Sequence, residues 1–240
     1  ILVLGWSHKV PALLREFGTY DIETYDVDVA SVVPVGERRE RISRTGPDLR
    51  SVSVTHRQLD YTLPDQLRTV EPAGYDFVMF VASDRLGSEE EADARTMLGL
   101  LLLQEVLPEN AERPQTVVEL HDPDNVPLLE PGLAEVIISP VLVSHMLAQV
   151  ALRRELRPVF EDLFTAGGAD LTFRTPAQYG IGGETLSFCR IEELAFRHGE
   201  MALGVLASAG PGRHDIELAP RRDRSFRMTG DRRIVVFHNY

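Results

Sequence analysis

The sequence predicts an α/β fold in which a parallel sheet with covering helices is followed by a smaller α+β domain. The chain opens on an apolar run at residues 1–4, ends it on Gly5 and continues at once into an amphipathic helix. A nearly continuous apolar run at residues 75–82 is typical of a central parallel strand covered on both faces. After Gly167 and Gly168 this alternation of strand and helix gives way to short strands around one helix.

Length and charge limit the classes of protein to consider. The 240 residues are enough for one large domain or two smaller ones. The net charge of −12 disfavours nucleic acid and anionic membrane surfaces as partners and leaves room for cation binding. The longest apolar run, residues 97–103, is far shorter than the roughly 20 residues of a membrane span, so no direct membrane insertion by this segment is expected. No signal peptide precedes the first strand, and this abrupt start suggests either a piece of a longer protein or a chain whose disordered start is not shown.

The turn after the first strand has the position of a dinucleotide-binding turn but not its sequence. Such a turn carries Gly-x-Gly-x-x-Gly, so that the backbone can approach a pyrophosphate at the helix N-terminus. Here Gly5 is present, whereas Ser7 and Val10 stand at the second and third glycine positions. We therefore predict a Rossmann-like frame with a degenerate nucleotide site at Gly5 and Ser7, whose ligand has been changed or lost.

The other elements of this first domain follow in order. A charged helix at residues 36–44 is expected to be a solvated face, and a further helix begins after Ser88, whose hydroxyl can cap it. Period-2 alternation and apolar runs predict further strands of the same sheet at residues 20–27, 51–55, 115–120 and 134–138.

Two acidic residues are candidates for the nucleotide site. Asp26 stands about 20 residues after the first glycine, at the predicted end of the second strand, where a Rossmann domain holds the ribose hydroxyls. An exposed acid at a strand end, in a segment crowded with acids, explains Asp26 equally well. Asp84 follows the strand at residues 75–82, at the carboxyl edge where ligands of open α/β sheets bind.

Three carboxylates after the strand at residues 115–120 form a candidate metal site. Glu119, Asp122 and Asp124 lie within six residues and offer the hard oxygen ligands that Ca²⁺ prefers. The segment lacks the glycine and the spacing of an EF-hand loop. The alternative, which we favour, is a turn at Asp122-Pro123 followed by a helix cap from Asp124 or Asn125.

A helix at residues 141–152 is apolar around most of its circumference. Ser139 and Pro140 predict its start, as cap and first-turn proline. A helix of this kind has to be buried on all sides, so we expect it to lie against another domain or another subunit. A second short helix follows at residues 157–164. The predicted division of the chain is 1–139 for the Rossmann-like domain, 140–167 for the crossover and linker helices, and 168–240 for the small α+β domain.

The small domain has shorter elements. A turn is expected at residues 180–183 and a helix at residues 185–197. Strand-like segments surround them at residues 170–174, 202–206, 215–218 and 233–238.

Five segments of the chain carry a resemblance to a known family. They are LGWSHKVPALLREF at the first turn, AEVIISPVLVSHMLAQVA through the crossover helix, PVFEDLF before the boundary, GGETLSFCRIEELAFRHGEMALGV in the small domain and the closing GDRRIVVF. Together they resemble an RCK (regulator of K⁺ conductance) unit. More narrowly, nearly the whole chain is similar to the cytoplasmic part of the CASTOR/POLLUX ion channels and their bacterial relatives, and most similar to the C-terminal RCK unit.

The resemblance implies a non-enzymatic gating-ring segment on the cytoplasmic side of a membrane. In that family RCK units pair through the crossover helix and the small domain, and the rings couple ligand binding to the opening of a cation pore. The implied partners are further copies of the chain and the transmembrane pore domain of the same full-length protein. Ca²⁺ regulation is an expectation of the resemblance, whereas the degenerate first turn disfavours NAD.

Two other interpretations stay open at this stage. The βα unit with Gly5 and Asp26 would also suit an NAD-dependent oxidoreductase of the Rossmann type. Loss of the phosphate turn would equally suit a structural ring unit that binds no ligand and only transmits force from a neighbouring domain.

Overall fold

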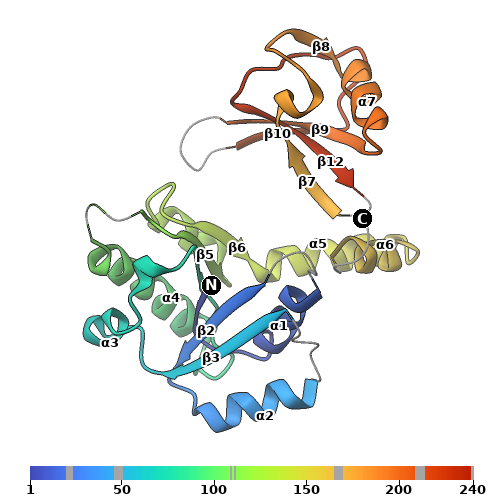
Figure 1. Cartoon of the computed structure of the whole chain (residues 1–240). Helices are drawn as coiled ribbons and strands as arrows, with labels where there is room; N and C mark the ends of the chain where they lie inside the picture. Colours follow the sequence, from blue (N-terminus) through green and yellow to red (C-terminus); the bar gives the residue numbers. More distant parts are fainter. Residues whose placement is uncertain are drawn as a thin grey trace. The chain divides into compact units, whose positions relative to one another are not determined.

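The chain consists of two compact units, Ile1–Arg154 and Glu155–Tyr240 (Figure 1). The computed structural model describes residues 1–19, 24–45, 51–108, 110, 112–164, 170–208 and 214–238. The crossover helix belongs to the first unit and the helix after it to the second. The three-part division expected from the sequence remains a prediction.

The described residues of the first unit form a six-stranded sheet in the order β3-β2-β1-β4-β5-β6 (Figure 1). Every neighbouring pair of strands is parallel, which confirms the Rossmann-like sheet. The strand order reverses between β1 and β4, so the switch point where such sheets bind ligands lies at the carboxyl ends of these two strands. The strands are β1 Leu2–Leu4, β2 Tyr25–Ser31, β3 Val52–Gln58, β4 Phe77–Phe80, β5 Gln115–Leu120 and β6 Glu135–Ile138.

Alternation along β1 divides the core between the two faces of this sheet. Leu2 and Leu4 are fully buried in one apolar cluster, together with Phe80 of β4. Val3 lies in a second cluster, together with Leu14 of the first helix. Successive side chains of a strand point to opposite faces, so a strand that is buried on both faces reads as a continuous apolar run.

Helices and short 3₁₀ turns connect the strands. Ser88 caps the longest helix as predicted, because its hydroxyl accepts a hydrogen bond from the backbone N–H of Glu91 (3.2 Å). In the described part of the chain, no helix combines the length and the apolar character of a membrane span. The connecting segments are α1 Val10–Thr19, α2 Val35–Thr45, α3 Pro64–Arg68, η1 Pro72–Gly74, α4 Glu89–Val106, η2 Pro123–Leu128 and α5 Ser139–Leu152.

Two expectations for the first unit are wrong. The second strand runs from Tyr25 to Ser31 rather than over residues 20–27, of which residues 20–23 lie outside the described part. Its buried positions are later in the chain than we expected, at Val27 and Val29, so Asp26 stands near the beginning of β2 and not at its carboxyl end.

The crossover helix α5 differs from the prediction at its cap. Pro140 is in its first turn as expected, but Ile138 takes the cap position and the described residues supply no side-chain cap. None of the described residues of α5 is buried, and the exposed fractions of Leu147 and Leu152 are 65% and 82%. Within the described part of the first unit no other element covers α5 on all sides, and its burial against another domain or subunit remains a prediction.

The described residues of the second unit form a four-stranded antiparallel sheet in the order β10-β9-β12-β7 and a two-stranded sheet, β11-β8. The predicted helix at residues 185–197 begins only at Phe188, because Thr185 to Ser187 pair with β11, a strand that the sequence did not predict. The elements are α6 Leu156–Phe164, β7 Asp170–Arg174, η3 Pro176–Tyr179, β8 Thr185–Ser187, α7 Phe188–Arg197, β9 Met201–Ser208, β10 His214–Leu218, β11 Ser225–Arg227 and β12 Arg232–His238.

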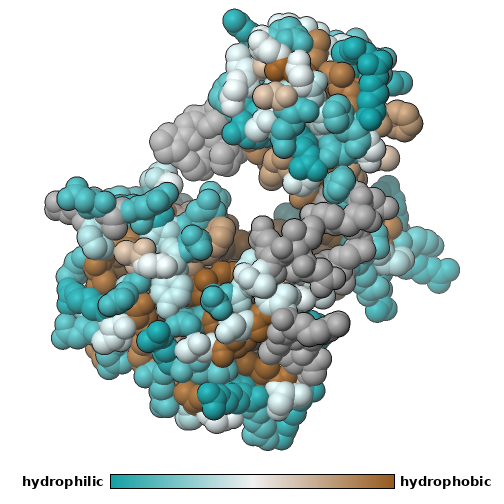
Figure 2. All heavy atoms as spheres, in the orientation of Figure 1, coloured by the Kyte–Doolittle hydropathy of each residue, from teal (hydrophilic) through white to brown (hydrophobic). Residues whose placement is uncertain are grey.

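The two faces of the four-stranded sheet have different environments. One face packs on α7, where Ile191 and Ala195 are fully buried beside Ile234. On the other face a cross-strand row joins Leu171, Phe237 and Met201. Directly opposed residues share a face, and the exposed fractions of Leu171 and Met201 are 52% and 64%. Among its described residues, the second unit thus leaves this apolar row largely uncovered, and Figure 2 shows hydrophobic residues at the molecular surface.

Candidate functional site

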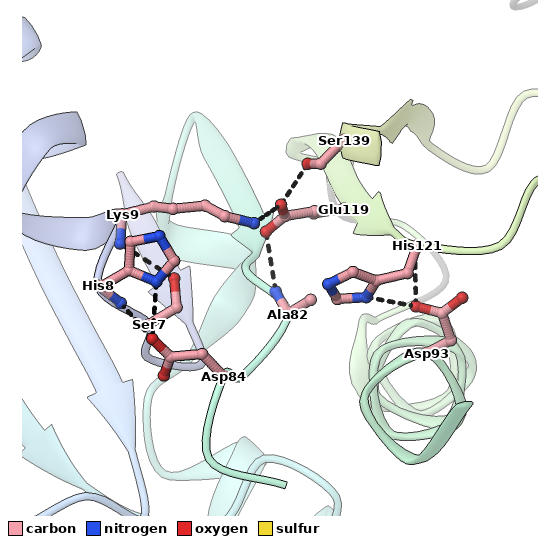
Figure 3. Close-up of polar contacts among 9 residues, drawn as sticks. All are labelled: Ser7, His8, Lys9, Ala82, Asp84, Asp93, Glu119, His121 and Ser139. Atoms are coloured by element: carbon pink, nitrogen blue, oxygen red, sulfur yellow. Dashed lines mark hydrogen bonds and ion pairs between the residues drawn. The ribbon is translucent and has the colours of Figure 1, made fainter. Parts of the chain in front are cut away.

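The candidate site lies at the carboxyl ends of β1, β4 and β5, around the turn that joins β1 to α1 (Figure 3). Gly5 has a φ of +108°, in the region that favours glycine. A Cβ on Gly5 would overlap the carbonyl oxygen of Val81 and lie 3.3 Å from its carbonyl carbon. The close approach of β1 to the end of β4 therefore explains this glycine without a ligand.

Side chains fill the other two glycine positions of the turn. Ser7 is fully buried, and its hydroxyl accepts a hydrogen bond from the backbone N–H of Lys9 (3.3 Å). Val10 is fully buried in the cluster beneath the turn. In a Rossmann turn the glycine backbone at these positions contacts a pyrophosphate. Here side chains of the chain itself occupy that space and pack in the core.

Asp84 is brought to this turn, as the sequence predicted. Its Oδ2 accepts a hydrogen bond from the backbone N–H of His8 (2.9 Å) and lies 2.8 Å from His8 Nδ1. Burial raises the pKa of Asp84, but the backbone and side-chain hydrogen bonds from His8 outweigh it and hold the pKa below its ordinary value. Asp84 is thus an ionised carboxylate that fixes the turn to the segment after β4.

Glu119 lies at the centre of the site, near the end of β5 (Figure 3). Its Oε1 accepts hydrogen bonds from the Lys9 ammonium and from the Ser139 hydroxyl. Its Oε2 accepts the backbone N–H of Ala82 (3.1 Å). The side chain of Glu119 is only 12% exposed. Ser139, which the sequence assigned to capping α5, therefore turns its hydroxyl to a partner 20 residues earlier.

Asp93 of α4 is a further buried carboxylate beside the site, which the sequence did not predict. With 1% of its surface exposed, it accepts hydrogen bonds from the backbone N–H groups of His121 (2.9 Å) and Asp122 (3.0 Å). The side-chain amide of Asn125 donates to it as well (2.9 Å), and His121 Nδ1 lies 3.1 Å away. Asp93 thereby holds the loop after β5 against α4.

The pKa of Asp93 is set by the same contacts. Burial raises this pKa, but the hydrogen bonds from Asp122, His121 and Asn125 lower it by more than burial raises it. The net pKa therefore lies below the ordinary value. An aspartate in the second turn of a predicted helix gives no sign of this role, since its partners lie about 30 residues later in the chain.

The predicted metal ligands are not gathered into one cluster. Asp122 caps η2, because its side chain accepts the backbone N–H of Asp124 (2.9 Å). A helix does begin at this turn as the alternative predicted, but the predicted cap from Asp124 or Asn125 is wrong, because Asp122 itself is the capping residue. Across the residues that the structure describes, no group of three His, Cys, Asp or Glu side chains could hold a metal ion. The carboxylate of Glu119 is instead paired with Lys9.

Asp26 does not join the other candidates. It is at the amino end of β2, where its backbone carbonyl accepts a hydrogen bond from the amino group of Ile1 (2.8 Å). Beyond the carboxyl end of β2, Glu37 at the start of α2 forms an ion pair with Arg85, whose Nη1 lies 2.9 Å from Glu37 Oε2. Gly5, Ser7 and Asp84 therefore meet at one edge of the sheet, while Asp26 lies at the other.

Comparisons with known proteins identify relatives of the chain. No protein-family model matches it. It is 25% identical over 242 residues to the "Ion channel CASTOR" of Lotus japonicus, covering 87% of this chain and 28% of the relative. It is 27% identical over 172 residues to the "Ion channel POLLUX" of the same plant, covering 68% of this chain and 18% of the relative. The chain thus spans less than a third of the length of these curated relatives.

A solved structure agrees on the fold. The structure of the human SLO3 gating ring matches 98% of this chain and 47% of its own, with a TM-score of 0.73 and 11% sequence identity. The resemblance expected from the sequence is confirmed: homologues of the chain are CASTOR and POLLUX ion channels, and its fold is that of the RCK units of a gating ring.

Proposed function

We propose that this chain is the cytoplasmic regulatory segment of a cation channel of the CASTOR/POLLUX type and has no enzymatic activity of its own. The similarity to CASTOR over 87% of the chain supports the channel class, and the gating-ring fold supports the regulatory role. The relatives are more than three times as long as the matched segment, which leaves room for a transmembrane pore domain in the same protein. The assignment to the C-terminal RCK unit is part of this proposal.

The uncovered helix α5 is the observation that carries the proposal. Its apolar residues lie on nearly every side, yet Leu142, Leu147 and Leu152 are 53%, 65% and 82% exposed. A helix of this composition is stable in water only when another surface covers it. We propose that second copies of the chain cover α5 and the uncovered sheet face of the second unit, which closes a symmetric ring.

Ligand control of such a ring needs a site that differs between two ring geometries. We propose that the carboxyl edge around Gly5, Ser7 and Asp84 is this site, because Lys9 of the same turn binds Glu119, which in turn binds the first residue of α5. The acidic composition makes Ca²⁺ the first ligand to test, with Asp122 and Asp124 as the exposed carboxylates nearest in sequence to Glu119.

Oligomeric state is the most direct test. Sedimentation equilibrium of the whole chain should show self-association. Leu142→Glu together with Leu147→Glu should weaken it, whereas Leu63→Glu, at a similarly exposed leucine (47%) before α3, should not. A chain that stays monomeric at all concentrations, or that associates equally well with both α5 substitutions, would contradict the ring.

Function in a channel can be tested by a chimera. The aligned segment of the Lotus japonicus CASTOR would be replaced by this chain, and currents recorded with and without Ca²⁺. Currents that respond to Ca²⁺ and lose the response with Asp122→Ala are the expected result. A chimera that assembles and conducts but never responds to Ca²⁺ would be consistent with the proposed ring. It would contradict the proposed Ca²⁺ site.

A ligand-free structural ring unit is the second candidate, because Ser7, Val10 and Glu119 fill the turn with the chain's own side chains. Calorimetric titration of the folded chain with Ca²⁺, K⁺, NAD and ATP separates the two candidates. Saturable heat lost in Asp122→Ala or Asp84→Ala supports ligand control. Silence with all four ligands supports the structural unit. Oxidation of NADH with a small carbonyl compound would overturn both.

A further inference from the structure

Three hydrogen-bond donors from separate parts of the first unit converge on one carboxylate (Figure 3). The Lys9 ammonium comes from the turn after β1, the Ala82 backbone N–H from the segment after β4, and the Ser139 hydroxyl from the start of α5. All three donate to the carboxylate of Glu119, which uses both of its oxygens.

The donors have the chemistry of an anion site. An ammonium, a backbone N–H and a hydroxyl are the groups that proteins use to hold phosphate and carboxylate oxygens. They lie at the switch point of the sheet, next to the turn where a Rossmann domain binds a pyrophosphate. The occupant here is a side chain that is only 12% exposed, whereas the side chain of Lys9 is 41% exposed.

We propose that Lys9, the Ala82 N–H and Ser139 form a preorganised site for one oxyanion, and that Glu119 is its built-in occupant. Glu119 is then a positioning residue whose carboxylate takes the place of a bound phosphate. Its hydrogen bonds connect the first turn and the end of β4 to the first residue of α5. This inference goes beyond the proposed function and does not depend on it, since it concerns the first unit whether or not the chain regulates a channel.

A vacant site makes the proposal testable, because removal of the occupant should let an external oxyanion bind. Glu119→Ala is the variant, Glu135→Ala at an exposed position of β6 is the matched control, and acetate and inorganic phosphate are the probes. The amide resonance of Ala82 in the whole chain reports binding, with chloride replacing the probe at constant ionic strength. The resonance should shift saturably in Glu119→Ala and stay constant in the wild type and in Glu135→Ala. It should also stay constant in Glu119→Ala combined with Lys9→Met.

Two results would overturn the proposal. One is a folded Glu119→Ala chain whose Ala82 resonance responds to acetate and phosphate no more than that of the wild type. The other concerns Glu119→Gln, which keeps the side-chain shape if the alanine variant does not fold. Loss of the charged acceptor should speed exchange of the Ala82 amide hydrogen by about tenfold or more, since opening becomes easier. Unchanged exchange would show that the carboxylate charge does not hold this segment.

Discussion

Replacement of Asp93 by alanine should destabilise the first unit more than the loss of an ordinary surface carboxylate. Asp93 is 1% exposed and accepts hydrogen bonds from two backbone N–H groups and the Asn125 amide, with His121 Nδ1 also within reach. Hydrogen bonds to a charged group contribute roughly 1.5–3 kcal/mol each, but they are not additive. The side chain of His121 is 16% exposed, so water replaces part of what is lost. We expect the free energy of unfolding to fall by about 3–5 kcal/mol.

Urea denaturation of the whole chain measures this loss through a probe confined to the first unit. The chain has a single tryptophan, and Trp6 is 2% exposed in the core beneath the first turn. Its fluorescence therefore reports on unfolding of this unit. Asp65→Ala is the control, because the side chain of Asp65 is 98% exposed and its loss should change stability by less than about 0.5 kcal/mol. A loss below about 1 kcal/mol in Asp93→Ala would refute the reasoning.

The pH dependence of the same variant gives an independent check. The pKa of Asp93 is lower in the folded chain than its ordinary value, which for the unfolded chain is about 3.9. The folded state therefore binds the proton more weakly. The stabilisation is present above the unfolded pKa and is lost as the pH falls through about 3.9 towards the folded pKa. Asp93→Ala should show a flatter decline between about pH 5 and pH 3 than the wild type.

Two further predictions concern single contacts. Gly5→Ala should lower the free energy of unfolding by about 2–4 kcal/mol in the same urea assay, since its Cβ would overlap Val81. Gly36→Ala, with none of the described residues within 4 Å, should raise it by about 0.5 kcal/mol, and equal effects at both glycines would contradict the argument. Tyr179→Phe should destabilise the second unit by about 1–2 kcal/mol, because the buried Glu200 carboxylate loses its phenol donor. Circular dichroism melting would test this, and an unchanged midpoint would show that the phenol contributes nothing.

The strands of the first unit were predictable because each leaves a local pattern of apolar and polar residues in a short stretch of sequence. β4 is an apolar run too short for a helix of the core, whereas β5 alternates between more and less exposed positions and has the bounds that the sequence predicted. The second strand was misplaced because acids surround it, and only Val27 and Val29 mark its buried positions.

The candidate site was less predictable, because its contacts join residues far apart in the sequence. Ser139 before Pro140 has every local sign of a helix cap. Its hydroxyl instead donates a hydrogen bond to Glu119, which lies within reach. The partners of Asp93 are likewise 28 to 32 residues away, so its role cannot be read from α4 alone. The sequence placed Gly5 in a degenerate phosphate-binding turn. In the structure the close approach of the Val81 backbone explains this glycine instead.

The contact between Lys9 and Glu119 also bears on the order in which the first unit folds. These residues are 110 positions apart, so their ion pair forms only after β5 has docked beside β4 and the intervening chain has been ordered. Closing a loop of that length costs conformational entropy, and contacts between neighbours in sequence do not offset this cost. We expect the pair to be absent from the transition state, so that its loss accelerates unfolding and leaves the refolding rate nearly unchanged. The ion pair would then act as a latch, closing last and setting how long the native state persists.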